Sequence, residues 1–233
     1  MSLETYSSAD DLYLARGREV NLRRPLLTGD VFKEVEIPGV GDEELAVLCA
    51  HPCSMRGLHA QLADRVLVGA VRDHAPVRRE EWMKGFFDRM PLPELLASGE
   101  LHVAHLDLVG RARTKDLGVG RRVACLSNFG INLLQQRFVW HLTRCAVETF
   151  KFHEACSHAL AEVDLLEDWN DILCEAGLAE PDALTRFDSF IRDRREGGRT
   201  RQDDLRDPQR RASVRSACRT EALRIASEVR SSD

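Results

Sequence analysis

The sequence predicts an α+β protein in which a small curled β-sheet or SH3-like barrel is followed by an all-helical C-terminal region. Three observations favour this class. Short apolar or alternating runs of strand length recur between residues 29 and 127. From Asn128 onward, apolar residues recur at spacings of three and four, which is the period of an amphipathic helix. The 233 residues are 43% hydrophobic and 30% charged, which is enough apolar material for a buried core.

Five segments of the first half have the pattern of strands. In the first of them, Val31, Val35 and Ile37 share one face of a period-2 pattern, and Pro38-Gly39 ends it. The other runs are rich in Val, Leu and Ala, as expected for strands buried on both faces. The five predicted strands cover residues 29–37, 45–51, 65–71, 100–112 and 118–127.

Short helices are expected between these strands. Ser8 is a suitable N-cap for a helix that would run to about Arg16. Trp82 and Phe86 lie near one helical face of a second segment, and Gly99 follows a third. The three predicted helices cover residues 9–16, 77–90 and 93–99.

The second half of the chain is predicted to be helical throughout. The amphipathic run over residues 130–173 should break into two or three helices, because an unbroken helix beyond about 25 residues is unusual in a compact domain. Gly197-Gly198 marks a flexible point, and Pro208 is placed to begin the last helix. We expect an N-terminal lead-in, a strand-rich domain, a helical region and a basic helical tail with the ranges 1–27, 28–127, 128–185 and 186–233.

Composition predicts a soluble cytosolic protein that requires no cofactor. The opening residues lack the apolar stretch of a signal peptide, and no apolar run approaches the roughly 20 residues of a membrane span. The seven cysteines are odd in number and irregularly spaced, which indicates free thiols in a reducing compartment. His153, Cys156 and His158 contain metal-binding side chains, but only the first two share a helical face, so no metal site is predicted.

Charge is unevenly distributed along the chain. Residues 186–230 contain 13 Arg and 8 Asp or Glu, a balance of +5, whereas the whole chain carries -5 and the remainder therefore about -10. Such a tail can bind nucleic acid, or it can dock on the acidic remainder of its own chain. The residues predicted to contact nucleic acid are Arg210, Arg211, Arg215, Arg219 and Arg224.

Two groups of residues in the strand-rich half are candidates for catalysis. His51, Cys53 and Arg56 follow the second predicted strand, where a thiol beside basic groups could act as a nucleophile. His105 and Asp107 alternate along the fourth strand, and a carboxylate could orient the imidazole for proton transfer. The alternative interpretations are a strand-to-loop turn at the first place and a polar strand face at the second. No GxSxG, Walker or kinase motif is present.

The order of these pieces resembles the PemK/MazF-like small barrels, which have an SH3-like fold and include toxin ribonucleases. Gly29-Asp30-Val31 opens the first strand, the runs LAVLCAH and RVLVGAV follow, and VACLSNFGINLLQQRF passes from strand to helix. The resemblance covers residues of about 28–140. The toxins carry an arginine before the second strand and a serine or threonine after the third, whereas this chain has Glu43-Glu44 and Val71-Arg72-Asp73 there. The resemblance therefore implies a barrel of bacterial conflict systems without the toxins' catalytic residues.

Two functions from different classes remain open. In the first, the chain is an accessory or binding subunit of a bacterial defence or toxin–antitoxin-type system. It would recognise nucleic acid or a protein partner through the barrel and assemble with a partner or with itself through its helices. In the second, it is a hydrolase or endoribonuclease that uses the cluster of His51, Cys53 and Arg56, aided by His105 and Asp107.

Overall fold

The structure, a computed structural model, describes residues 3–56, 62–118, 120–195 and 197–232. Contacts between residues divide the chain into two compact units. The sheet unit comprises Met1–Leu22, Leu26–Met55 and Ala63–Ala155, and the helical unit comprises Arg23–Pro25, Arg56–Leu62 and Cys156–Asp233.

A seven-stranded antiparallel sheet forms the sheet unit, with the strand order β1-β7-β2-β3-β4-β6-β5. Its members are β1 (Tyr13–Arg16), β2 (Asp30–Ile37), β3 (Gly41–Leu48), β4 (Arg65–Asp73), β5 (Arg89–Pro93), β6 (Leu101–Arg113) and β7 (Arg122–Leu126). All five predicted strands are present, as β2, β3, β4, β6 and β7.

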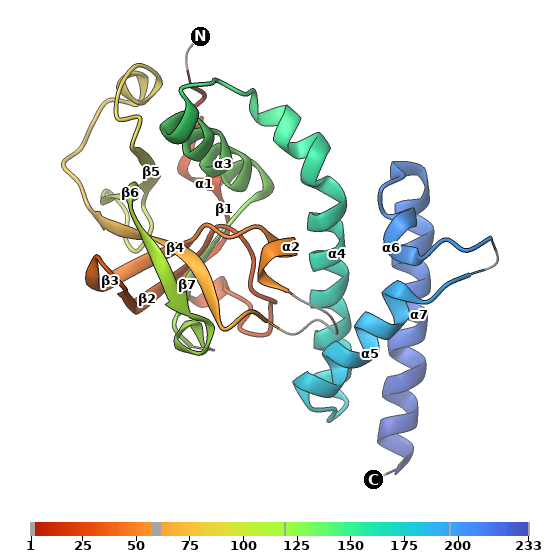
Figure 1. The fold of residues 1–233 in the computed structure, drawn as a ribbon. Helices are drawn as coiled ribbons and strands as arrows, with labels where there is room; N and C mark the ends of the chain where they lie inside the picture. Colours follow the sequence, from red (N-terminus) through yellow and green to blue (C-terminus); the bar gives the residue numbers. More distant parts are fainter. Residues whose placement is uncertain (1–2, 57–61, 119, 196, 233) are drawn as a thin grey trace. The chain divides into compact units, whose positions relative to one another are not determined.

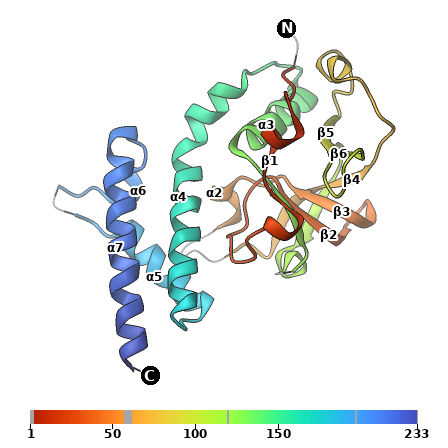
Figure 2. The same ribbon diagram turned by 180° about the vertical axis from the view of Figure 1, so that it is seen from behind.

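The sheet is strongly curled (Figures 1 and 2). Side-chain hydrogen bonds connect the strand at one edge, β1, to the strand at the other edge, β5, and to the residue after it. The Tyr13 hydroxyl on β1 donates a hydrogen bond to the carbonyl oxygen of Pro93 on β5 at 3.0 Å. Arg16 on β1 likewise donates to the carbonyl oxygen of Glu94 at 2.8 Å. Seven antiparallel strands that curl without closing into a backbone ladder make a half-barrel, and a helical region follows it. The predicted α+β class is confirmed.

Both faces of the curled sheet are packed. Phe32, Ala46 and Ala70 lie in register across β2, β3 and β4, and they belong to one buried cluster. The neighbouring register positions, Val31 and Val47, are also fully buried. This explains why β3 and β4 read as continuous apolar runs rather than alternating ones.

Helix α3 (Asn128–Thr143) is joined to the rest of the sheet unit by a buried arginine. The Arg137 side chain is fully buried and donates to the carbonyl oxygens of Arg89 at 3.1 Å, Trp82 at 2.9 Å and Glu4 at 3.3 Å. Burial lowers the pKa of Arg137 to about 10. One guanidinium group thus ties three separate segments to α3. At the other end of the helix, the Ser127 hydroxyl accepts from the Gly130 N–H at 3.1 Å and caps the first turn.

The predicted helix over residues 9–16 is correct at its start only, and the predicted helix over residues 93–99 is wrong. Helix α1 covers only Ala9–Leu12, and the next four residues pair with β7 as β1. Residues 89–93 pair with β6 as β5, and no helix follows within residues 93–99. Pro91 and Pro93 are tolerated in β5 because an edge strand needs hydrogen bonds on one side only. Tertiary pairing has overridden local helix propensity at residues 13–16, whereas residues 94–99 form turns.

The predicted helix over residues 77–90 is also wrong. It is reduced to one short 3-10 helix, η3 (Arg79–Met83). Phe86 adopts a left-handed conformation with a φ of 54°, which ends the helical geometry. Its ring then stacks on Trp82 with 4.7 Å between ring centres. The aromatic residues therefore pack by a turn of the chain rather than along a helical face.

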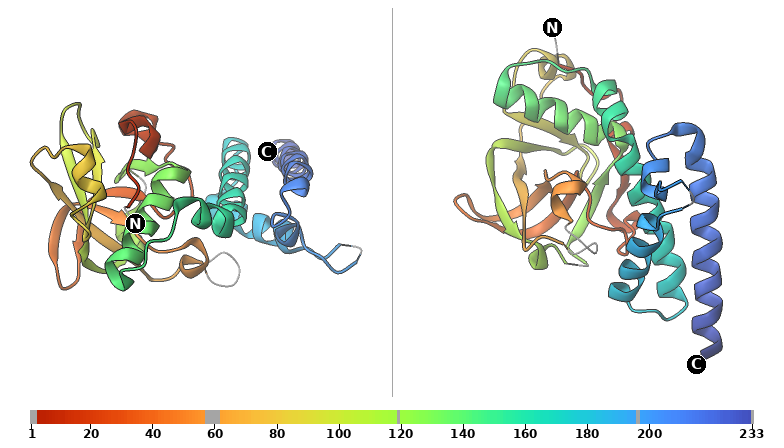
Figure 3. Two further views of the ribbon diagram at one scale, coloured as in Figure 1. Left: turned by 90° about the horizontal axis from the view of Figure 1, so that it is seen from above. Right: turned by 45° about the vertical axis from the view of Figure 1, so that its right-hand side comes forward.

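Four helices make up most of the helical unit: α4 (Thr149–Glu175) from Cys156 onward, α5 (Glu180–Arg192), α6 (Arg201–Asp204) and α7 (Pro208–Ser232). The amphipathic run breaks at residues 144–148 into α3 and α4, as predicted, and Pro208 begins the last helix as expected. The second half of α4 and α7 run side by side in the same direction (Figure 3). No helix among the described residues has the length and apolarity to cross a membrane.

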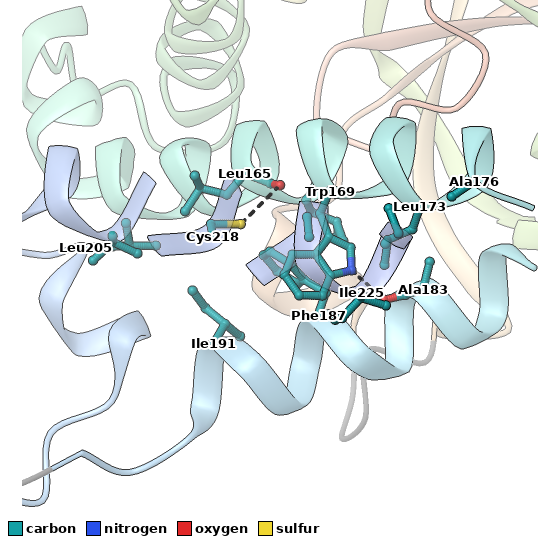
Figure 4. Packing of buried hydrophobic residues seen from close by; sticks show 14 residues of the cluster. Leu165, Trp169, Leu173, Ala176, Ala183, Phe187, Ile191, Leu205, Cys218 and Ile225 are labelled. Carbon is teal, nitrogen blue, oxygen red and sulfur yellow. Dashed lines mark hydrogen bonds between the residues drawn. The ribbon is translucent and has the colours of Figure 1, made fainter. Parts of the chain in front are cut away.

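Trp169 lies at the centre of the core of the helical unit (Figure 4). It is 1% exposed, and its indole N–H donates to the carbonyl oxygen of Ala183 at 3.0 Å. Phe187 packs against it edge-on at 5.7 Å between ring centres. Removal of a buried aromatic side chain of this size typically costs about 3–5 kcal/mol of stability. This one residue therefore joins α4 to α5.

Candidate functional site

His51 and Cys53 lie in the turn that follows β3. Pro52 and Met55 of the one-turn helix α2 (Pro52–Met55) are buried, whereas Cys53 is exposed. The Cys53 backbone N–H donates to Nδ1 of His51 at 3.2 Å. Nδ1 of His51 accepts this hydrogen bond with its lone pair. The same lone pair is then not available to take a proton from the Cys53 thiol. The geometry explains these residues as an anchored turn.

Arg56 belongs to the helical unit, whereas His51 and Cys53 belong to the sheet unit. It forms an isolated antiparallel bridge with Leu62. The three residues that are neighbours in the sequence are thus divided between two units, and residues 57–61, which follow Arg56, lie outside the described residues.

His105 and Asp107 lie in a bulge of β6. The register passes from Gly69 opposite Val109 to Val71 opposite Ala104, so β6 contains extra residues at this point. The His105 Nδ1 atom is 3.4 Å from Asp107 Oδ1, and the His105 side chain is 13% exposed. Bulges often re-aim side chains next to functional sites. This bulge brings His105 and Asp107 together, but the imidazole of His105 is nearly buried.

A tighter pair of a histidine and a carboxylate lies nearby on β6 and β4. His102 Nε2 is 3.0 Å from Asp73 Oδ1, and the two residues are directly opposite each other in the register. They line a groove of about 720 Å³ whose walls also include Lys33 and the carboxylates of Asp42 and Glu100. This pair was not predicted from the sequence, because only the strand register brings Asp73 and His102 together.

Three of the five tail arginines predicted to contact nucleic acid hydrogen-bond to other groups of the helical unit. Arg224 bonds to Glu221 at 2.7 Å and also to Glu228. Arg211 donates to the carbonyl oxygen of Leu205 at 2.7 Å, and Arg210 bonds to Asp204. The other two, Arg215 and Arg219, are exposed.

The carboxylate of Asp204 gathers three arginines around itself. Arg210 lies 3.0 Å from Oδ1, Arg199 lies 3.3 Å from the same atom, and Arg195 lies 3.3 Å from Oδ2. Asp204 is 5% exposed, whereas the three arginine side chains are each about half exposed. We call Arg195, Arg199, Arg210 and Asp204 the arginine cluster. Its formal charge is +2, from three guanidinium groups and one carboxylate.

A tight turn holds two members of the arginine cluster in place. The Arg195 N–H donates to the Arg199 carbonyl oxygen at 3.0 Å, and the Gly198 N–H donates to the Arg195 carbonyl oxygen at 2.9 Å. Gly197 and Gly198 have φ angles of 88° and 78°, a region that side chains disfavour. The Gly-Gly pair, which the sequence marked as a flexible point, is here the bend of this turn.

The arginine cluster has the chemistry of an oxyanion-binding site. Each guanidinium group has five N–H donors in a fixed plane, and one carboxylate cannot accept all fifteen. The half-exposed groups therefore retain donors for solvent or a ligand. Guanidinium groups bind phosphate and carboxylate oxygens in pairs of parallel hydrogen bonds. Asp204 can also have a purely structural role, in which it connects the turn to α7. That role needs one or two arginines and does not account for the third.

Comparison with known proteins gives no family assignment: no family model and no curated protein matches the chain. Within the described residues, no three His, Cys, Asp or Glu side chains converge in a way that could hold a metal ion. Sequence reasoning named Arg210 but missed Arg195, Arg199 and Asp204. The available signal was the capping sequence Thr200-Arg201-Gln202-Asp203 before Asp204, which fixes a helical turn at this point.

Proposed function

We propose that this chain is a binding subunit that holds the phosphate backbone of a nucleic acid on its arginine cluster, as an accessory component of a bacterial defence or toxin–antitoxin-type system. The observation that carries the proposal is the convergence of Arg195, Arg199 and Arg210 on the single buried carboxylate of Asp204. The arrangement favours binding rather than catalysis, because it contains no Ser, Cys or His, and its one carboxylate is buried and surrounded by three arginines.

Preorganisation makes this cluster a better phosphate site than a set of separate surface arginines. A free arginine side chain loses up to about 2 kcal/mol of conformational entropy when a ligand fixes it. Here the turn and Asp204 have already fixed the three guanidinium groups in the folded protein. A polyanion can therefore bind without that loss, even though the whole chain carries -5.

The likeness to PemK/MazF-like small barrels supports the choice of biological system. The curled antiparallel half-barrel agrees with that likeness at the level of architecture. The residues that replace the toxins' catalytic positions, and the use of His51 Nδ1 by a backbone N–H, both favour a subunit that binds rather than cleaves. If the alternative hydrolase were correct, Cys53→Ala and His51→Ala would each abolish cleavage of RNA by the purified protein.

The test is the salt dependence of binding, measured by fluorescence anisotropy with labelled DNA and RNA. Three phosphate contacts predict a slope of log affinity against log salt of about -3 for a duplex and about -2 for a single strand. The triple variant R195Q/R199Q/R210Q should lose binding.

A matched control removes the same charge elsewhere. Arg65, Arg78 and Arg113 are exposed arginines of the sheet unit, and R65Q/R78Q/R113Q should bind like the wild type. If both triple variants lost affinity equally, binding would depend only on the net charge of the protein and not on the arginine cluster. The absence of binding by the wild type would overturn the proposal.

A further inference from the structure

A second feature of the helical unit lies beside the arginine cluster. A groove of about 900 Å³ lies between α5 and α7, and its lining includes Trp169 and Ile225 of the core. Figure 4 shows these two residues within the core. Arg201 lines this groove and opens the same four-residue helix, α6, that ends at Asp204. One short helical turn therefore connects the groove, which Arg201 lines, to the arginine cluster, which Asp204 centres.

Hydroxyl groups make up much of the polar lining. Ser213, Ser216 and Thr220 come from exposed positions on α7, and Ser189 comes from α5. The Ser189 hydroxyl donates to the carbonyl oxygen of Thr185, whereas the other three have no hydrogen-bond partner among the described residues. A hydroxyl group both donates and accepts, so this lining can pair with the edge of any nucleobase.

Three arginines and the carboxylates of Asp193 and Glu221 complete the lining. Arg224 is paired with Glu221 at 2.7 Å. Of the other two arginines, one is held in place, and it also lies 3.4 Å from the carboxylate of Asp193. The Arg201 guanidinium carbon lies 4.1 Å from the centre of the Phe190 ring, and Nη1 donates to the Phe190 carbonyl oxygen at 2.9 Å. Its side chain is 20% exposed. The other, Arg186, is exposed and makes no hydrogen bond or ion pair with any described residue. A fixed guanidinium plane is a stacking surface for a base, and a free guanidinium is a phosphate contact.

We infer that the α5–α7 groove receives an unpaired nucleotide, so that the strand bound by the arginine cluster is single-stranded. The inference rests on the proposed function and deepens it. A groove of this volume is far larger than a phosphate needs and is within the usual range for sites that enclose a small organic ligand. Bases paired and stacked inside a duplex cannot enter it. The phosphates next to the seated nucleotide would lie on the arginine cluster.

The experiment compares one labelled strand, as RNA and as DNA, alone and annealed to its complement. We expect the single strand to bind about tenfold more tightly than the duplex, because stacking of one base typically contributes a factor of that order. Ser216→Trp fills the groove from an exposed position without touching the arginine cluster. It should weaken single-strand binding about tenfold and leave duplex binding unchanged.

Ser227→Trp is the matched control, because Ser227 is exposed on the same helix but does not line the groove. It should bind both substrates like the wild type. Arg186→Gln serves as a second groove variant if Ser216→Trp unfolds, which circular dichroism would show. Equal binding of strand and duplex with no effect of the groove variants would overturn this inference while leaving the proposed function intact. If the wild type bound neither the single strand nor the duplex, both the proposed function and this inference would be overturned. The comparison of RNA with DNA shows which sugar is preferred.

Discussion

Replacement of Asp204 by asparagine should destabilise the helical unit by about 3 kcal/mol. The side chain keeps its shape but loses the charge that holds three guanidinium groups at 3.0–3.3 Å. A hydrogen bond to a buried charged group contributes about 1.5–3 kcal/mol, and an exposed ion pair about 0.2–1 kcal/mol. Because the carboxylate is buried but the arginines are half exposed, we take about 1 kcal/mol for each of the three contacts.

Urea unfolding followed by far-ultraviolet circular dichroism measures this change. Asp207→Asn is the matched control, since its carboxylate is 39% exposed and lies near Arg210 alone, at 3.2 Å. Asparagine can still accept the hydrogen bond from the Gln209 N–H at the start of α7. The control should therefore lose no more than about 1 kcal/mol.

A double-mutant cycle tests whether the arginines act through Asp204. Arg199→Gln should cost about 1 kcal/mol in the wild type and almost nothing in the Asp204→Asn background, because the contact is already absent. If Asp204→Asn were no more costly than Asp207→Asn, or if the two effects simply added, the arginine cluster would not be held by this carboxylate. The preorganisation that supports the proposed function would then be refuted.

Three further outcomes are expected. Gly130→Ala should lower the melting temperature and cost about 1–3 kcal/mol, because the new methyl group would collide with a carbonyl oxygen of α1; an unchanged melting curve would contradict the packing of α1 on α3. Hydrogen bonds from the Thr200 N–H and hydroxyl lower the pKa of Asp203 below 3.8. The ionised carboxylate therefore contributes its full stabilisation above the pKa of the unfolded state, and this stabilisation is lost as the pH falls through the pKa of the folded state. The stability difference between wild type and Asp203→Ala should therefore shrink in acid below about pH 4, and a difference independent of pH would refute the capping role. Burial raises the pKa of Cys49 to about 12, so mass spectrometry after brief alkylation near neutral pH should find Cys53 modified and Cys49 untouched until urea is added.

Much of the sheet could be predicted from the sequence, and the omissions have one cause. β2, β3, β4, β6 and β7 carry alternating or apolar runs that bury their own side chains, so their pattern is local. β1 has four residues and β5 contains Pro91 and Pro93, and both exist because a neighbouring strand offers them hydrogen bonds. Information of that kind lies in the tertiary structure and is absent from any short window of sequence.

The candidate site was predictable only in its charge. Counting residues located the basic segment, but five arginines on α7 were predicted to act, whereas the structure draws Arg210 together with Arg195 and Arg199 from the preceding turn. The convergence depends on Asp204 being buried beneath the turn. Hydrophobic periodicity identifies buried apolar residues and not buried carboxylates. An aspartate is rarely buried without charged partners, and the partners of Asp204 are known only from the structure.

The mixed charges of the basic segment organise its arginines rather than cancel them. Asp188, Asp193, Asp204, Asp207 and Glu221 each lie within ion-pair distance of an arginine of the same segment. The segment still carries a balance of +5, from 13 Arg against 8 Asp or Glu over residues 186–230. Interleaved acidic residues are therefore compatible with a polyanion-binding surface.

The residues that precede this segment have the opposite charge. Residues 156–185 contain eight Asp or Glu and neither Lys nor Arg. Helices α4 and α7 lie side by side (Figure 3), so the acidic stretch and the basic segment are on neighbouring helices. In the function proposed above, the basic residues 186–230 would attract a polyanion and the acidic residues 156–185 would repel it, so the nucleic acid would approach the part of the unit that holds α6 and the arginine cluster.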